Sequence, residues 1–197
     1  MFNDTSSLRA FLTTRRSAKP RDLVAPGPND DELRQIIAIA ARSPDHGKLH
    51  PWRFVHVRQE RRTDFAAVLK RAYLRENPTP GRLEQEANDK FAHQAPELIV
   101  ALSSPRAGIK IPVWEQELSC GAACMNLLSA AAALGFAGGW VTGWAAYNDE
   151  VRDAFGSREE RIAGFIFLGT MGADYEERLR PSVEEVWSEW SLPGPGA

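Results

Sequence analysis

Two continuous apolar segments place the strongest constraint on how this chain folds. The segments Leu98-Ile99-Val100-Ala101-Leu102 and 162–169 contain no charged residue. Uninterrupted apolar runs of this length are typical of strands in the interior of a sheet, because a strand with one solvent-exposed face alternates apolar and polar residues. A long alanine-rich helix is expected between them, over 114–134. The sequence therefore predicts an α+β fold in which helices pack on a central sheet.

Shorter elements are indicated by their boundary residues. Ser7 is a helix N-cap, and the helix it begins is expected to end before Arg15. Pro28-Asn29-Asp30 begins a second helix that breaks at Ser43-Pro44, and the alternation over 52–57 predicts a strand. Further helices are expected near 65–72, 83–91 and 148–155, and the segment 138–143 is a glycine-bracketed loop or a short strand. Neither a repeat nor a low-complexity linker divides the sequence, so residues 1–197 are interpreted as one domain.

Charge is distributed unevenly along the chain. The net charge of −2 and the isoelectric point near 6.1 argue against a nucleic-acid or membrane-surface protein, both of which favour a basic excess. Residues 1–21 nevertheless have a local balance of +4, and residues 174–190 a local balance of −4. A nearly neutral total conceals a basic start and an acidic end.

The cysteines and histidines limit further which class of protein this sequence can encode. The two cysteines, Cys120 and Cys124, are four residues apart in a predicted helix, and they are interpreted as small core residues in a reducing compartment. The four histidines show no ligand spacing with them, so no metal site is expected. With no secretory signal and no apolar run of about 20 residues, we expect a cytoplasmic protein without a membrane partner.

Common catalytic signatures are absent, so any difficult chemistry is expected to belong to a cofactor. Three segments could hold one. The segment Arg15-Arg16-Ser17-Ala18-Lys19 gathers cations and a hydroxyl suited to a phosphate, although a solvated basic turn is the alternative. The segment 42–47 is more polar than a simple connection requires. The glycines of 138–143 permit close approach to a flat ligand, although simple tight turns would explain them equally.

Taken together and in order, these segments resemble the FMN-dependent nitroreductases. The similarity rests on Arg-Arg-Ser-x-Lys, on Ser43-Pro44-Asp45-His46 followed by Pro51-Trp52-Arg53-Phe54, and on Ala95-Pro96-x-Leu98-Ile99-Val100. It continues through Leu134-Gly135-Phe136, Gly138-Gly139-Trp140 and Phe167-Leu168-Gly169, so that it covers roughly residues 8–190. The chain is most similar to the short members of the family whose second motif reads Pro-Asp-His.

The resemblance implies an intertwined homodimer with a mixed, largely antiparallel sheet flanked by helices and with FMN at the subunit interface. Arg15, Arg16 and Ser17 would bind the phosphate and ribityl region, and Lys19 would lie near the pyrimidine edge of the ring. Arg42, Pro44, Asp45 and His46 would come from the partner subunit. Trp140, Val141 and Thr142 would line the isoalloxazine ring, and Arg178 and Arg180 would close over the phosphate. No side chain is assigned an obligatory catalytic role.

The implied activity is a ping-pong transfer of hydride from NADH or NADPH through FMN to a nitroaromatic, quinone or related small-molecule acceptor. An FMN-binding or sequestering protein without turnover, or a specialised flavin-consuming enzyme, is the alternative. A structural protein that has lost the cofactor is disfavoured, because it would not need the paired cations. Lys48, His50 and Val141 depart from the usual family pattern, and the segment 72–90 resembles the insertion that covers the substrate face. The sequence does not choose between NADH and NADPH or identify the acceptor.

Overall fold

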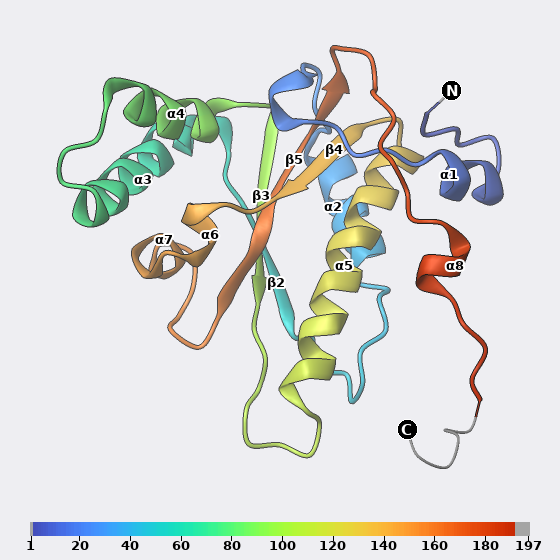
Figure 1. The fold of residues 1–197 in the computed structure, drawn as a ribbon. Coiled ribbons are helices and arrows are strands. Elements are labelled where there is room, and N and C mark those ends of the chain that lie inside the picture. Colours follow the sequence, from blue (N-terminus) through green and yellow to red (C-terminus); the bar gives the residue numbers. More distant parts are fainter. Residues whose placement is uncertain (1, 192–197) are drawn as a thin grey trace.

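A five-stranded antiparallel sheet forms the centre of the computed structural model, which describes residues 2–191 (Figure 1). The strands are β1 (Leu23–Val24), β2 (Trp52–His56), β3 (Glu97–Ser103), β4 (Ala137–Val141) and β5 (Arg161–Met171). The order is β1-β5-β3-β2, and β4 also pairs with β5. The two apolar segments that the sequence singled out are therefore β3 and β5, which pair with each other in the interior of the sheet.

Helices cover both faces of this sheet (Figure 1). On one face lie α3 (Arg62–Glu76), α4 (Arg82–His93), α6 (Trp144–Tyr147) and α7 (Asp149–Asp153), and on the other lie α2 (Asp30–Ala40) and α5 (Val113–Ala133). Alternate residues of β5 point to opposite faces, so Phe165 packs toward α3 and α4 whereas Ile166 packs toward α2 and α5. The predicted α+β class with a largely antiparallel sheet is confirmed.

Capping residues explain where the helices begin. Asn29 accepts hydrogen bonds from the backbone N–H groups of Asp31 and Glu32, and the Glu32 carboxylate accepts one from the backbone N–H of Asn29. This reciprocal arrangement satisfies donors that the first turn of a helix leaves unpaired. Ser7 caps α1 (Leu8–Thr14) in the same way, by accepting from Ala10. Both predicted helix starts are confirmed.

The structure decides one open prediction and adds elements that were not predicted. The segment 138–143, expected to be a loop or a short strand, begins as strand, because β4 pairs along β5. The helix predicted over 148–155 is confirmed as α7, for which Asn148 is the N-cap by accepting from Val151, and the short helix α6 that precedes it was not predicted. The two-residue strand β1 and the short helix α8 (Val183–Val186) were not predicted; α8 begins at a capping box of Ser182 and Glu185, whereas β1 has no local signal.

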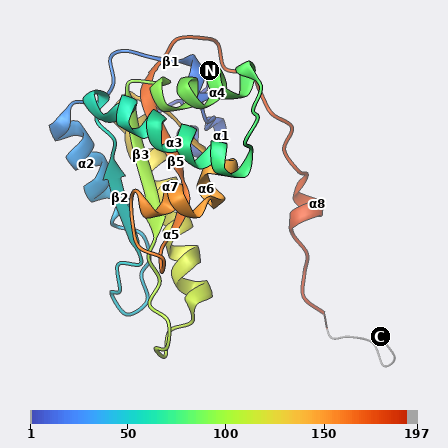
Figure 2. The same ribbon diagram turned by 90° about the vertical axis from the view of Figure 1, so that its left-hand side faces the viewer.

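The described part of the chain ends in an extended segment, residues 174–191, which we call the C-terminal arm. It carries α8 and projects away from the body of the molecule (Figure 2). Its large apolar side chains are exposed: Leu179, Val183, Val186, Trp187 and Trp190. Apolar residues concentrated on a projecting segment commonly mark an interaction surface.

A buried arginine joins the ends of four elements on the sheet face that α3 and α4 cover. The Arg62 side chain is 0% exposed and lies at the start of α3, immediately after the 3-10 helix Gln59–Arg61. It donates to the carbonyl oxygens of Val57, Ala92 and Pro96 at 2.8, 2.9 and 3.2 Å. Arg62 thereby connects the end of β2, the end of α4 and the approach to β3.

Among residues 2–191, none of the helices combines the length and the apolar character that crossing a bilayer requires.

Candidate functional site

The predicted basic segment 15–19 lies along the edge of β4. The backbone N–H of Ala18 donates to the carbonyl oxygen of Gly138 at 2.8 Å. A Cβ atom added to Gly139 would lie 2.3 Å from the carbonyl oxygen of Ala18, so the approach of the two backbones requires glycine at that position. The Arg-Arg-Ser-x-Lys and Gly-Gly-Trp motifs are therefore neighbours in space, although more than 100 residues separate them in the chain.

The C-terminal arm meets the same basic segment. Arg16 Nε donates to the carbonyl oxygen of Glu176 at 2.8 Å, and Lys19 Nζ binds the Glu176 carboxylate at 2.8 Å. Arg180 Nη2 donates to the carbonyl oxygen of Arg15 at 3.4 Å. The structure thus brings Arg180 to the predicted phosphate residues. Arg178 is exposed on the same arm, and its backbone N–H donates to the Glu177 carboxylate at 2.7 Å.

Cations outnumber acids around Arg15, because Arg16 and Arg180 share one carboxylate, that of Glu177, at 3.9 and 3.7 Å. The Arg15 guanidinium has no carboxylate within ion-pair distance in the described part of the chain, and its Nη1 donates to the Ser17 hydroxyl at 3.2 Å. The pKa of Arg15 is lowered from its ordinary value, first by burial and then by the charges of Arg180 and Arg16. A cluster whose members repel one another is stabilised by an anion, and a phosphate offers acceptors to all of these donors. The residues present therefore fit the phosphate end of a nucleotide cofactor.

The predicted partner-derived segment, 42–46, lies elsewhere. Pro44 accepts a hydrogen bond from the Ser119 hydroxyl, and His46 Nδ1 lies 2.8 Å from Glu115 Oε2, so both residues contact the N-terminal half of α5. The Asp45 carboxylate accepts from the backbone N–H groups of Leu49 and His50 at 3.0 and 2.9 Å. These contacts hold a loop in which Lys48 and His50 adopt positive φ angles of 57° and 51°. Asp45 thus organises this loop, and Arg42 is exposed at its start.

Within one chain the two predicted halves of the site do not meet. Arg15, Arg16 and Ser17 line a cavity of about 10 Å³ together with Leu128 and Ala132, near the C-terminal end of α5. Ser119, which contacts Pro44, precedes Leu128 by nine residues, or about 14 Å of helix at about 1.5 Å per residue. The two groups of predicted site residues, which we call half-sites, therefore lie apart along a single helix.

Aromatic and backbone groups of β4 follow the part of the strand that contacts the basic segment 15–19. Trp140 is 37% exposed, and its Nε1 donates to the carbonyl oxygen of Ala163 at 3.0 Å, which holds the indole across β5. Val141 points to the opposite face and packs in the core with α3 and α4. Thr142 follows the strand and is exposed. The structure thus leaves an indole and an exposed backbone turn next to the basic segment.

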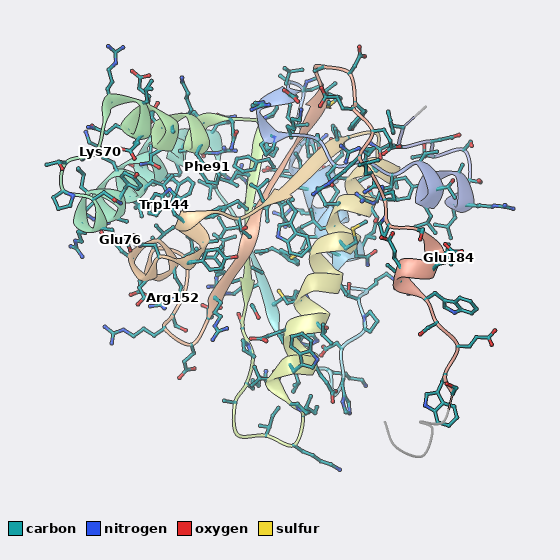
Figure 3. All side chains as sticks on the ribbon, in the orientation of Figure 1. Lys70, Glu76, Phe91, Trp144, Arg152 and Glu184 are labelled. Atoms are coloured by element: carbon teal, nitrogen blue, oxygen red, sulfur yellow. The ribbon has the colours of Figure 1, made fainter. Side chains whose placement is uncertain are left out.

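The segment 72–90 comprises the end of α3, a loop and most of α4, packed on the sheet face opposite α5. Trp144 of α6 connects it to β4: the Tyr73 ring centroid lies 5.0 Å from that of Trp144, and Trp144 Nε1 donates to Asn88 Oδ1 at 3.2 Å. Figure 3 shows Trp144, Glu76 and Phe91 gathered on this side, whereas Glu184 of α8 lies on the other. The segment is therefore attached to the strand that carries Trp140.

Sequence reasoning missed three residues that contact the basic segment: Asn3, Glu176 and Glu177, the last at 3.9 Å from Arg16 Nε. Asn3 makes two hydrogen bonds to the backbone of Arg16, and Glu176 binds Lys19. A lone asparagine near the start and two glutamates in an acidic tail carry no motif, so only the folded arrangement identifies them. Within residues 2–191, no group of three His, Cys, Asp or Glu side chains is placed to hold a metal ion.

Comparison with known proteins places this arrangement in a family. The family model described as "Nitroreductase family" matches residues 12–170. A curated Escherichia coli K12 protein named "Putative NAD(P)H nitroreductase YdjA" is 37% identical over 161 residues, which is 81% of this chain and 86% of that protein. The fold of the present chain is similar to that of a nitroreductase-like family protein from Bacillus cereus. The TM-score is 0.78 and the identity 20%, over 93% of this chain and 95% of the other. A nitroreductase from Bacteroides fragilis solved with bound FMN gives a TM-score of 0.65 and 22% identity, over 87% and 92% of the two chains.

Proposed function

We propose that this chain, which belongs to the nitroreductase family, is an FMN-dependent NAD(P)H oxidoreductase that reduces small-molecule acceptors such as nitroaromatics or quinones. The observation that carries the proposal is the cluster of Arg15, Arg16, Ser17 and Arg180, which lacks a matching number of acids and lies against the Gly-Gly-Trp edge of β4. When bound, FMN would accept hydride from NAD(P)H and pass it to the acceptor in a ping-pong cycle.

Each described group has a defined part in this proposal. Arg15, Arg16, Ser17 and Arg180 bind the phosphate, and Arg178 supplies further positive charge from the same arm. Lys19 lies near the pyrimidine edge, where a cation stabilises negative charge on the reduced ring. Trp140 and Thr142 form the side of the site that faces the ring, whereas Val141 contributes only its backbone there, because its side chain packs toward α3 and α4. Because the ring and the electron donor provide the reactivity, these residues bind, orient and tune.

A second copy of the chain completes the site in this proposal. Trp114 and Leu118 are 66% and 54% exposed on one face of α5, next to the segment that carries Pro44 and His46. An exposed apolar helix face of this kind is typical of a protein interface. Pairing two chains through it would bring Arg42, Pro44, Asp45 and His46 of one protomer to the cations of the other. A homodimer would thereby unite the half-sites that a single chain keeps apart.

Anaerobic reduction tests the proposed activity. Protein purified with FMN is mixed with NADH or NADPH while the flavin absorbance bands are followed. Rapid loss of the oxidised bands, followed by their return when a nitroaromatic or quinone is added, is the expected result. Protein that retains FMN but is not reduced on the timescale of turnover would instead be a flavin-binding or sequestering protein, and protein that never binds FMN would refute the proposal.

Replacement of Leu118 by lysine is expected to give a monomer with weakened FMN affinity, because a charge buried in an apolar interface is strongly unfavourable. The measurement is light scattering at micromolar protein concentration, with FMN titration on the same samples. Leu83→Lys is the matched control, since Leu83 is 79% exposed on α4, on the opposite sheet face. A Leu118→Lys protein with the mass and FMN affinity of the unmodified chain would contradict the proposed interface.

A further inference from the structure

Asn3 makes a two-point contact with the basic segment. Its Nδ2 donates to the carbonyl oxygen of Arg16 at 3.1 Å, and its Oδ1 accepts from the backbone N–H of Arg16 at 2.8 Å. A side-chain amide can satisfy the donor and the acceptor of one residue at once, as a neighbouring strand would. Both backbone groups of Arg16 are therefore fixed by a single side chain that lies 13 residues earlier in the chain.

The backbone around Asn3 is itself held against α1. The N–H of Asn3 donates to the carbonyl oxygen of Thr14 at 3.1 Å, and the N–H of Asp4 donates to the Thr14 hydroxyl at 2.9 Å. Asn3 adopts a φ of 51°, in the left-handed region that asparagine tolerates better than most residues. The amide consequently approaches Arg16 from a fixed position.

This contact lies within the segment that carries the phosphate donors. Arg16 stands between Arg15 and Ser17, and the next backbone anchor is the bond from Ala18 to Gly138. Asn3 also lines the small cavity that Arg15, Arg16 and Ser17 share. Loss of the amide would free the backbone between the end of α1 and β4, and with it the relative orientation of the Arg15 guanidinium and the Ser17 hydroxyl.

We infer that Asn3 is a positioning residue for the phosphate group of the cofactor, an inference that rests on the proposed function. Asn3 holds the Arg15-Arg16-Ser17 backbone in the conformation that receives a phosphate monoester. Its effect is confined to the phosphate end of the ligand, because its contacts reach neither Trp140 nor the arginines of the C-terminal arm.

The test compares FMN with riboflavin, which has the same ring system without the phosphate. Asn3→Gly removes the amide and leaves a residue that adopts a positive φ without strain. We expect the FMN dissociation constant to rise about tenfold, since two hydrogen bonds are lost and partly replaced by water. The riboflavin dissociation constant should stay within about twofold. Thr13→Ala is the matched control, because the Thr13 hydroxyl bonds only the carbonyl oxygens of Arg9 and Ala10 within α1.

Flavin fluorescence titration gives both constants. Unchanged FMN affinity in Asn3→Gly would overturn the inference, and so would an equal loss of FMN and riboflavin affinity, since that pattern indicates general destabilisation. Retained riboflavin binding by the variant also shows that it is folded. If the unmodified chain binds no FMN, the proposed function itself fails, which is distinguishable because that result does not involve the variant.

Discussion

Replacing Arg15 by alanine is expected to weaken FMN binding by roughly 10- to 150-fold, the largest effect of any single change at the proposed site. A hydrogen bond to a charged group contributes about 1.5–3 kcal/mol, and Arg15 has no competing carboxylate among the described residues. The substitution also removes the partner of the Ser17 hydroxyl. The measurement is the flavin content of the purified protein, together with titration of the apoprotein by fluorescence quenching.

The matched control is Arg9→Ala, which removes the same charge from the exposed surface of α1. It is expected to leave FMN binding within about twofold of the unmodified protein, because exposed charges at a distance are screened by salt. Unchanged FMN retention in Arg15→Ala would show that the phosphate assignment is wrong. Equal losses in both variants would show that general basic charge, rather than the cluster beside β4, attracts the cofactor.

Replacing Arg62 by alanine is expected to lower the free energy of unfolding by about 3–5 kcal/mol. The substitution leaves the carbonyl groups of Val57, Ala92 and Pro96 buried without this donor, and it opens a cavity at the start of α3. Burial lowers the pKa of Arg62 to about 10, and the nearby Glu97 carboxylate partly offsets that shift. The group is therefore still a cation at neutral pH, and it is held by carbonyl dipoles.

Urea denaturation measures this effect, and Arg61→Ala is its control. Arg61 is the preceding residue in the chain, but it is exposed and forms a surface ion pair with Asp64 at 3.0 Å, so its loss should cost less than about 1 kcal/mol. The two variants differ in burial and not in the type of side chain removed. A loss below about 1 kcal/mol for Arg62→Ala would mean that the carbonyl groups find water or other partners after the substitution.

Elements with local signals were predictable from the sequence. The Asn29 capping box, the Ser7 cap and the apolar runs of β3 and β5 each depend on residues a few positions apart, and the structure confirms all of them. The strand β1 was not predictable, because two residues carry no periodicity and the strand exists only through its pairing with Thr170 and Met171. Segment boundaries shifted by one to four residues for the same reason, since tertiary contacts decide where a helix frays.

The candidate site was predictable in its parts and not in its connections. The residue types in 15–19 indicated a phosphate site, and family resemblance added Arg180 from the far end of the chain. The contacts of Asn3 and Glu176 with this segment span 13 and 157 residues. Neither a charge count nor a spacing rule reveals a contact of that kind, because each depends on how the chain closes on itself.

The two half-sites on α5 have a consequence for how cofactor and assembly depend on each other. If FMN binds only where two chains meet, then it stabilises the pair by the same free energy with which pairing increases its affinity. Flavin content would then depend on protein concentration, and dilution would release cofactor without any change in the chain. Because the length of α5 separates Pro44 from Arg15 within one chain, the equilibrium between monomer and dimer would then determine how much active enzyme is present.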